Sequence, residues 1–263
     1  MSILVEKRGR VTILTIDRPQ AKNALDIATS RELAQRFIEF RDDAEAWVAI
    51  LTGAGGDAFC AGGDLKKMAE YYASLTPPER RMRGEVEPGI GGITRNLPIW
   101  KPIISAINGY CLAGGLELAL ACDLRVAEEH AQFGLTEVKW GIIPGAGGTQ
   151  RLPRLIGMDK ALDLMMTARK MSAEEALQCG LISRLVDRGQ ALSTAIELAE
   201  QICQNAPLAL RAVKEAVMRG IDMSLDEGLR LEQFLAEPCR QSEDAKEGPR
   251  AFINREKPQF KGR

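Results

Sequence analysis

Apolar positions recur with two different periods in the first part of the chain. Residues 2–7 and 11–16 alternate or run apolar on either side of a glycine, which predicts a β-hairpin. Between Asp26 and about Arg41 apolar side chains recur every three or four residues, which predicts an amphipathic helix that Asp26 caps. Residues 47–52 form a continuous apolar run and predict a buried strand. Strands and helices therefore alternate from the start.

The stretch from residue 101 to residue 150 carries the strongest pattern. Residues 103–107 predict a buried strand, a turn follows, and a helix begins at Gly114 and Gly115. That helix is apolar on almost every side, as is typical of a buried helix. It nevertheless carries Glu117 in its first turn. A buried carboxylate is costly unless another group pairs with it or the chemistry uses it.

Glycine and proline divide the rest of the chain. A helix from Leu65 is expected to stop at Pro77-Pro78, and residues 83–96, with four glycines and a proline, are expected to form the loosest segment. From residue 191 onward the pattern is helical, with breaks expected at Pro207, Gly220 and Pro238. Strands alternating with helices and then helices alone predict an α/β core with a helical C-terminal part.

Two serine–glutamate pairs with the spacing of a capping box mark further helix starts. Ser172 with Glu175 forms one pair, and Ser224 with Glu227 forms the other. In such a box each side chain accepts a hydrogen bond from the backbone of its partner, so each pair predicts a helix N-terminus.

Composition and charge narrow the function classes. The 263 residues are 45% hydrophobic and 27% charged with a formal net charge of −1, as in an ordinary soluble globular protein without general attraction to nucleic acid or membranes. We expect no signal peptide and no membrane span. Six cysteines without a C-x-x-C pair predict reduced thiols in the cytoplasm and no metal site. The single histidine argues against a Ser-His-Asp or Cys-His mechanism.

Glycine junctions and carboxylates together suggest an acid/base site. The glycine pairs that end at Gly63 and begin at Gly114 each follow a strand and open a helix, where N–H groups are free. Two such ends that converge would form an oxyanion hole. Taken alone, a glycine pair is more typical of a tight turn and close packing. Likewise Glu117 alone is typical of an acid that favours the helix dipole, and Glu137 alone of a solvated or capping carboxylate.

Several motifs in order resemble the enoyl-CoA hydratase/isomerase (crotonase) family, and the resemblance covers nearly the whole chain. They are Arg18-Pro19 with Asn23-Ala24-Leu25, Phe59 to Lys66 (FCAGGDLK), Asn108 to Ala119 (NGYCLAGGLELA), Gln132 to Glu137 (QFGLTE), Ile143 to Pro153 (IPGAGGTQRLP), and the ending with Glu247-Gly248, Ala251-Phe252 and Phe260-Lys261. The resemblance implies an α/β spiral of β-β-α turns over residues 1–190. It implies a helical trimerisation region over residues 191–263, usually in a homo-oligomer that is a dimer of trimers.

The resemblance also implies roles for individual residues. The N–H groups of Gly63 and Gly114 would hold the thioester oxygen as an enolate forms. Many relatives have alanine where Gly63 stands, which leaves a main-chain donor unchanged. Glu117 would activate water for attack at C3, Glu137 would supply a proton to C2, and the N–H of Gly145 would help hold the water.

Coenzyme A would be part of the substrate, with no separate cofactor and no metal. By resemblance it would lie along Lys22, Ala24, Leu25, Ala61, Gly63, Asp64, Leu65, Lys66 and Gly114. Phe252 and Arg255 from a neighbouring chain would also reach it; the cation is arginine where others have lysine.

The expected protein is a cytoplasmic enoyl-CoA hydratase that converts a trans-2-enoyl-CoA to the 3-hydroxyacyl-CoA in fatty-acid β-oxidation or related acyl-CoA degradation. One alternative is a Δ3,Δ2-enoyl-CoA isomerase or a specialised acyl-CoA hydratase or dehydratase of the same family. Isomerases commonly work with one acid, so the paired glutamates favour hydration. A remoter alternative is an RNA-binding relative, but acids offset the basic residues of segment 26–43, which argues against nucleic acid and against membranes as partners.

Overall fold

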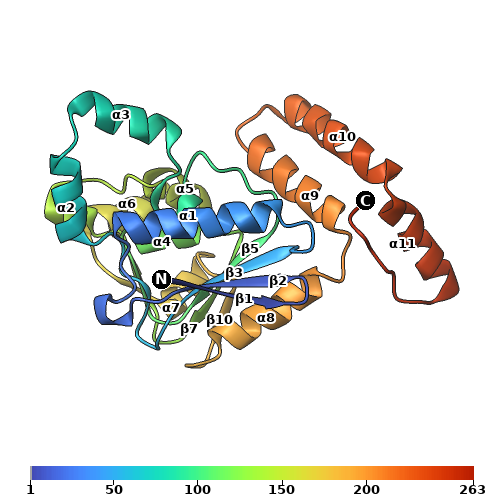
Figure 1. Ribbon diagram of the computed structural model, residues 1–263, viewed down its shortest axis with the longest axis horizontal. Helices are drawn as coiled ribbons and strands as arrows, with labels where there is room; N and C mark the ends of the chain where they lie inside the picture. The colour runs from blue at the N-terminus through green and yellow to red at the C-terminus, as the bar shows by residue number, and fades with distance from the viewer. Residues whose placement is uncertain (1) are drawn as a thin grey trace.

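Two β-sheets lie at the centre of the computed structural model, which describes residues 2–263 apart from the side chain of Arg83 (Figure 1). The larger sheet has the order β1-β2-β3-β5-β7-β10, with strands Ile3–Arg8, Val11–Ile16, Val48–Gly53, Ile103–Ile107, Leu124–Glu128 and Arg184–Val186. The smaller has the order β4-β6-β8-β9, with strands Ala58–Cys60, Tyr110–Leu112, Gln132–Gly134 and Met171–Ser172. Only the pairs β1–β2 and β8–β9 are antiparallel.

Helices cover these sheets and form the C-terminal part. The α-helices are α1 Ile27–Asp42, α2 Leu65–Ala73, α3 Pro77–Val86, α4 Gly114–Ala121, α5 Gly148–Ile156, α6 Met158–Thr167, α7 Ala173–Gln178, α8 Ala191–Ile202, α9 Pro207–Gly220, α10 Leu225–Gln241 and α11 Glu243–Asn254. Short 3-10 helices are η1 Pro19–Ala21, η2 Ile90–Gly92 and η3 Glu137–Trp140. Of the helices in residues 2–263, none is both long and apolar enough to cross a membrane.

The chain winds as a spiral in which each turn adds one strand to each sheet. The turns are β3-β4-α2, β5-β6-α4 and β7-β8-η3, and successive turns pair in parallel in both sheets. The predicted α/β spiral of β-β-α turns is therefore confirmed. The predicted N-terminal hairpin is also confirmed as β1 and β2.

Helices pack on both faces of the larger sheet through apolar side chains. On one face Leu33 and Phe37 of α1 join a fully buried core with Leu14 of β2. On the other face Ala195 and Ala199 of α8 pack in a second core. The first helix beyond residue 190, α8, thus packs on the sheet. The division into a core of residues 1–190 and a helical region of residues 191–263 stays a prediction.

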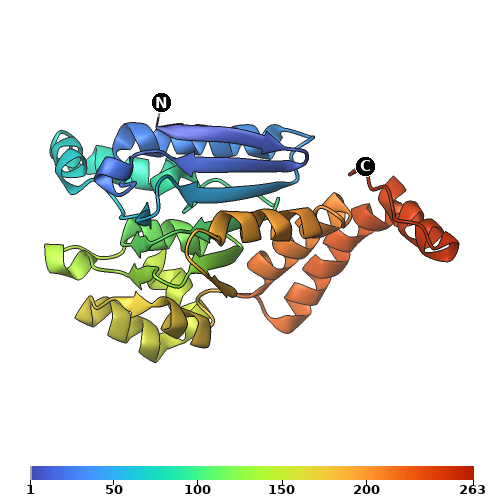
Figure 2. The same cartoon turned by 90° about the horizontal axis from the view of Figure 1, so that it is seen from below.

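Beyond α8, the helices α9, α10 and α11 extend to one side of the sheets (Figure 2). Helices α9 and α10 pack on each other, and α10 begins at the predicted capping box, in which Ser224 and Glu227 exchange both hydrogen bonds. The predicted break at Pro238 is wrong, because α10 continues past this residue to Gln241.

The segment that follows the helix expected from Leu65 contains a further helix that was not predicted. Helix α2 ends at Ala73, before Pro77-Pro78 as expected, but a further helix, α3, begins at Pro77 and runs to Val86, into the segment 83–96 that was expected to be loose. Proline is tolerated in the first turn of a helix because its missing N–H has no partner there. The Glu79 carboxylate accepts hydrogen bonds from both the N–H and the hydroxyl of Thr76, at 2.7 Å each, and so fixes this helix start.

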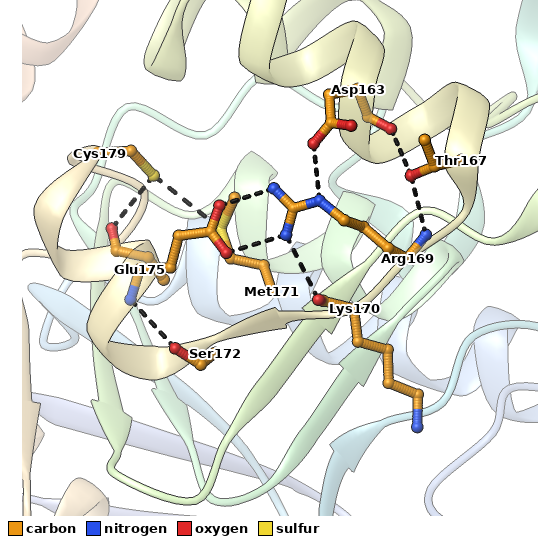
Figure 3. A network of polar contacts seen from close by, with 9 residues as sticks. Asp163, Thr167, Arg169, Lys170, Met171, Ser172, Glu175 and Cys179 are labelled. Carbon is orange, nitrogen blue, oxygen red and sulfur yellow. Dashed lines mark hydrogen bonds and ion pairs between the residues drawn. The ribbon is translucent and has the colours of Figure 1, made fainter.

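The capping box predicted at Ser172 is only half present. The Ser172 hydroxyl accepts from the N–H of Glu175 at 3.2 Å, but the Glu175 carboxylate turns to Arg169, with contacts of 2.6 and 2.9 Å. Arg169 also reaches Asp163 of α6 at 2.6 Å, so it lies between two acids (Figure 3). This network ties α6 and α7 together across β9, the strand that pairs with β8. An ion pair with Arg169, six residues before Glu175, has replaced the second half of the box.

Gly115 is a position where the spiral admits no side chain. A methyl group there would lie 2.0 Å from the carbonyl oxygen of Cys60, where β4 ends. We therefore expect Gly115→Ala to lower the free energy of unfolding by at least about 2 kcal/mol, since α4 must move away from β4. Urea unfolding measures this change.

Gly228→Ala is the matched control, because Gly228 lies within α10 and the nearest atom, the carbonyl oxygen of Gly220, is 3.9 Å from its added methyl group. It should gain about 0.4–1 kcal/mol by restricting the unfolded chain. Equal effects of the two substitutions would contradict the packing described for α4.

Candidate active site

The smaller sheet brings three loops to one edge. Strands β4, β6 and β8 are parallel neighbours, with Cys60 opposite Cys111 and Leu112 opposite Gly134. Parallel strands end at the same edge, so the segments that follow them meet there. These segments carry Gly63, Gly114 and Glu137.

Gly63 and Gly114 lie next to each other at this edge. A methyl group on Gly114 would lie 3.6 Å from the backbone nitrogen of Gly63. In the part of the chain that the structure describes, neither N–H group donates a hydrogen bond. Ala113, just before Gly114, has φ 50° and ψ −129°, a rare backbone conformation for a side chain with a Cβ. The junction therefore offers two free donors side by side on a strained turn.

Glu117 is held by backbone groups in a buried position. It is 3% exposed, and its Oε1 accepts hydrogen bonds from the N–H groups of Ala146 at 2.7 Å and Gly148 at 2.8 Å. Burial raises the pKa of Glu117, while these two bonds and the charges of Arg151 and Arg95 lower it. A methyl group on Gly148 would lie 3.1 Å from Oε1, so glycine leaves room for this carboxylate.

Glu137 has a different environment at the start of η3. It is 7% exposed, and its Oε2 is buried with no hydrogen-bond partner among the described residues. Burial, with a further contribution from the charge of Glu117, raises the pKa of Glu137 to about 7. Two buried carboxylates that interact thus differ in their hydrogen bonding, and Glu137 is the one that holds a proton near neutrality.

The predicted coenzyme A residues fall into two groups in one chain. Segments 22–25 and 61–64 lie side by side, because Ala61 N–H donates to the Lys22 carbonyl at 3.0 Å and Asp64 N–H donates to the Leu25 carbonyl at 2.9 Å. The exposed Lys66 follows in the first turn of α2. The remaining members of this group are Ala24, Leu65 and the glycine junction itself.

Phe252 and Arg255 belong to the second group. They lie in and just after α11, at the opposite end of the molecule from α2 (Figures 1 and 2). Phe252 is 85% exposed. Within one chain these residues do not join the site.

The sequence did not indicate which donors hold Glu117. Gly145 was expected to hold the attacking water through its N–H, which stays a prediction; this N–H donates to no group among the described residues, and the Gly145 carbonyl accepts from Arg95. The donors to Glu117 are Ala146, the next residue, and Gly148. The glycine-rich loop was the available signal, but loop dihedrals decide which of its N–H groups face a carboxylate.

Two apolar side chains, Met68 and Ile90, adjoin the glycine junction. Met68 and Ile90 have atoms 3.5 and 4.0 Å from a methyl group placed on Gly63, and Ile90 lies 2.9 Å from one placed on Gly114. Ile90 lies in the glycine-rich segment, whose path in space the sequence does not give.

The raised pKa of Glu137 predicts a pH-dependent stability. Its folded pKa of about 7 exceeds the ordinary value of 4.5, so between these values the folded state keeps a proton that the unfolded state releases. Stability associated with this group is present below about pH 4.5 and is lost as the pH rises through about 7. Glu137→Gln removes the titration, so the variant should become more stable than wild type by up to about 3 kcal/mol above pH 7.

Urea unfolding between about pH 4 and pH 8 measures this difference. The exposed Glu197 of α8 offers a matched control as Glu197→Gln, which should follow wild type at each pH. A Glu137→Gln difference that does not change with pH would contradict the raised pKa.

Comparisons with known proteins agree with this geometry. The family model described as enoyl-CoA hydratase/isomerase matches residues 6–263. The (E)-benzylidenesuccinyl-CoA hydratase of Thauera aromatica is 41% identical over 100% of both chains. The short-chain-enoyl-CoA hydratase of Clostridium acetobutylicum is 40% identical over 97% of this chain and 96% of the relative. The crystal structure of an enoyl-CoA hydratase from Mycobacterium tuberculosis H37Rv is 43% identical, covers 100% of this chain and 99% of its own, and superposes with a TM-score of 0.91. The chain, built around two adjacent glycine junctions and a buried glutamate pair, belongs to the enoyl-CoA hydratase/isomerase family.

Proposed function

We propose that this protein is an enoyl-CoA hydratase, a hydro-lyase that adds water across the 2,3 double bond of a trans-2-enoyl-CoA. The observation that carries the proposal is the pair of buried carboxylates, Glu117 and Glu137, in one site with two free N–H groups. The relatives named as hydratases of CoA thioesters support the reaction class. Its six free thiols support the cytoplasm as the location of the enzyme. We also assign the enzyme to β-oxidation or related acyl-CoA degradation.

The N–H groups of Gly63 and Gly114 would hold the thioester oxygen. As water attacks C3, the π electrons of the double bond move toward C2 and the carbonyl, and negative charge gathers on this oxygen. Fixed dipoles stabilise such charge without reorganising, and loss of one donor commonly costs about 10²–10³ in rate.

The protonation states of the two carboxyl groups assign them opposite roles. Glu117 accepts two N–H bonds that favour its charged form, so it takes a proton from the attacking water whose oxygen bonds to C3. Glu137, with its pKa raised to about 7, carries the proton that moves to C2 as the enolate collapses. Proton exchange with solvent then restores both groups.

Coenzyme A would follow the paired segments 22–25 and 61–64 toward the glycine junction. Lys66, exposed at the start of α2, would contact its phosphates. We propose that Phe252 and Arg255 of a neighbouring copy complete this binding in a homo-oligomer, either a trimer or a dimer of trimers. Their distance from α2 within one chain supports a contribution between copies (Figure 1).

Hydration of crotonyl-CoA, followed as loss of enoyl-thioester absorbance, tests the reaction. Wild type should hydrate it, and Glu117→Gln and Glu137→Gln should each lower kcat by about 10²–10⁴, because each removes a proton acceptor or donor. Glu197→Gln should retain wild-type activity, since Glu197 lies exposed on α8.

The same variants distinguish hydration from Δ3,Δ2-isomerisation. A 3-enoyl-CoA isomerised rapidly by wild type and by Glu117→Gln would favour the isomerase alternative, in which one acid suffices. A wild type inert on crotonyl-CoA and on longer enoyl-CoAs would overturn the hydratase proposal and direct tests to specialised acyl groups.

Light scattering and kinetics test the shared site. We expect the mass of a trimer or a hexamer, and we expect Arg255→Ala to raise KM about tenfold with little change in kcat, as loss of uniform binding does. The exposed Lys257 provides the control Lys257→Ala, which should leave KM unchanged. A monomer with full activity would contradict the proposal.

A further inference from the structure

Arg95 contacts two segments, helix α3 and the loop of residues 141–147 between η3 and α5, which we call the catalytic loop. Its Nη1 donates to the Gly84 carbonyl of α3 at 3.2 Å, and its Nη2 donates to the carbonyl of Gly145. These acceptors lie 11 and 50 residues away in sequence, so the contacts follow from the fold. Arg95 itself comes from the turn between η2 and β5.

The Gly145 carbonyl shares its peptide group with the N–H of Ala146. This N–H is one of the two donors that hold Glu117 Oε1, at 2.7 Å. A peptide whose oxygen accepts from a guanidinium is fixed in orientation and polarised, which strengthens its N–H as a donor. Arg95 therefore acts on Glu117 through one rigid peptide plane.

Arg151 holds the neighbouring peptide in a similar way. Its Nη1 donates to the Ala146 carbonyl at 3.3 Å, and its Nη2 donates to the Thr94 carbonyl at 2.9 Å. Thr94 directly precedes Arg95, so the two guanidinium groups tie the catalytic loop to a single turn. That loop is thereby fixed at two successive carbonyls.

The same turn also holds the segment that precedes it. Asn96 Nδ2 donates to the carbonyls of Glu85 at 2.9 Å and Glu87 at 3.0 Å, where α3 ends. Ile90 of this segment adjoins the glycine junction. We call residues 77–92, which comprise α3 and η2, the covering segment.

We propose that Arg95 is a positioning residue that couples the covering segment to the general base, by fixing the Gly145–Ala146 peptide that aims Glu117. The coupling rests on the proposed function, in which Glu117 is the base. Arg95 touches neither carboxylate nor the glycine junction through any hydrogen bond among the described residues.

The charges around Glu117 determine in which direction its pKa moves when Arg95 is removed. Glu137 of η3, Arg151 of α5 and Arg95 face it from the elements that surround it. Burial raises the pKa of Glu117, and the positive charges of Arg151 and Arg95 lower it. Removing Arg95 therefore raises this pKa and moves the acidic limb of the rate profile to higher pH.

Arg95→Met keeps a side chain of moderate length but removes the charge and the donors. We expect kcat for crotonyl-CoA to fall by about 10²-fold, as small misplacements of a catalytic group do, with KM changed less than about threefold. The acidic limb should move upward. Arg95→Lys should restore the position of the limb and part of the rate, because it keeps the charge with a single ammonium donor group.

Arg81→Met is the matched control. Arg81 lies in the covering segment, its side chain is 84% exposed and it pairs with Glu85, so its loss should change neither the rate nor the limb. An Arg95→Met enzyme with wild-type kcat and pH profile, or one altered only in KM, would overturn the proposal.

A measurement that needs no enzymatic turnover tests the role of Arg95 independently of the proposed function. The carboxyl of Glu117 is titrated by NMR with carbon-13 glutamate in the Glu137→Gln background, and Glu117→Gln identifies its resonance. Arg95→Met should raise the pKa of Glu117 and change its chemical shift at high pH, while the spectra of the core remain folded. An unchanged titration overturns the role of Arg95, even if wild type proves inactive on enoyl-CoAs.

Discussion

Parallel pairing of β4, β6 and β8 is the constraint on which the site depends. It ends three short strands at one edge, and the residues that follow them, Gly63, Gly114 and Glu137, meet there. Where two parallel strands are only three residues long, the register decides which backbone N–H groups face one another.

The second constraint is the cost of two buried carboxylates. Glu117 meets this cost through two backbone donors and two nearby arginines, whereas Glu137 meets it by keeping a proton. The same desolvation thus leads to different protonation, because the glycine-rich loop serves only one of the acids. An acid/base pair requires this difference.

The sequence predicts those features whose causes are local. Asp26 caps α1 and Glu117 falls in the first turn of a buried helix, because capping chemistry and periodicity act over a few residues. The half-formed box at Ser172 was mispredicted because Arg169 competes for Glu175 (Figure 3). The arginines that brace the catalytic loop were not found, since their acceptors are backbone carbonyls that only the fold brings within reach.

We propose that the N–H groups of Gly63 and Gly114, which come from different turns of the spiral, form one oxyanion site. Isotope-edited infrared spectroscopy of enoyl-CoA labelled with carbon-13 at the thioester carbonyl, bound to Glu137→Gln to slow turnover, tests it most directly. Two hydrogen bonds from Gly63 and Gly114 should weaken the carbonyl bond and move its stretch to lower frequency than in free enoyl-CoA. A bound carbonyl that vibrates at the free frequency would contradict an oxyanion site formed by Gly63 and Gly114.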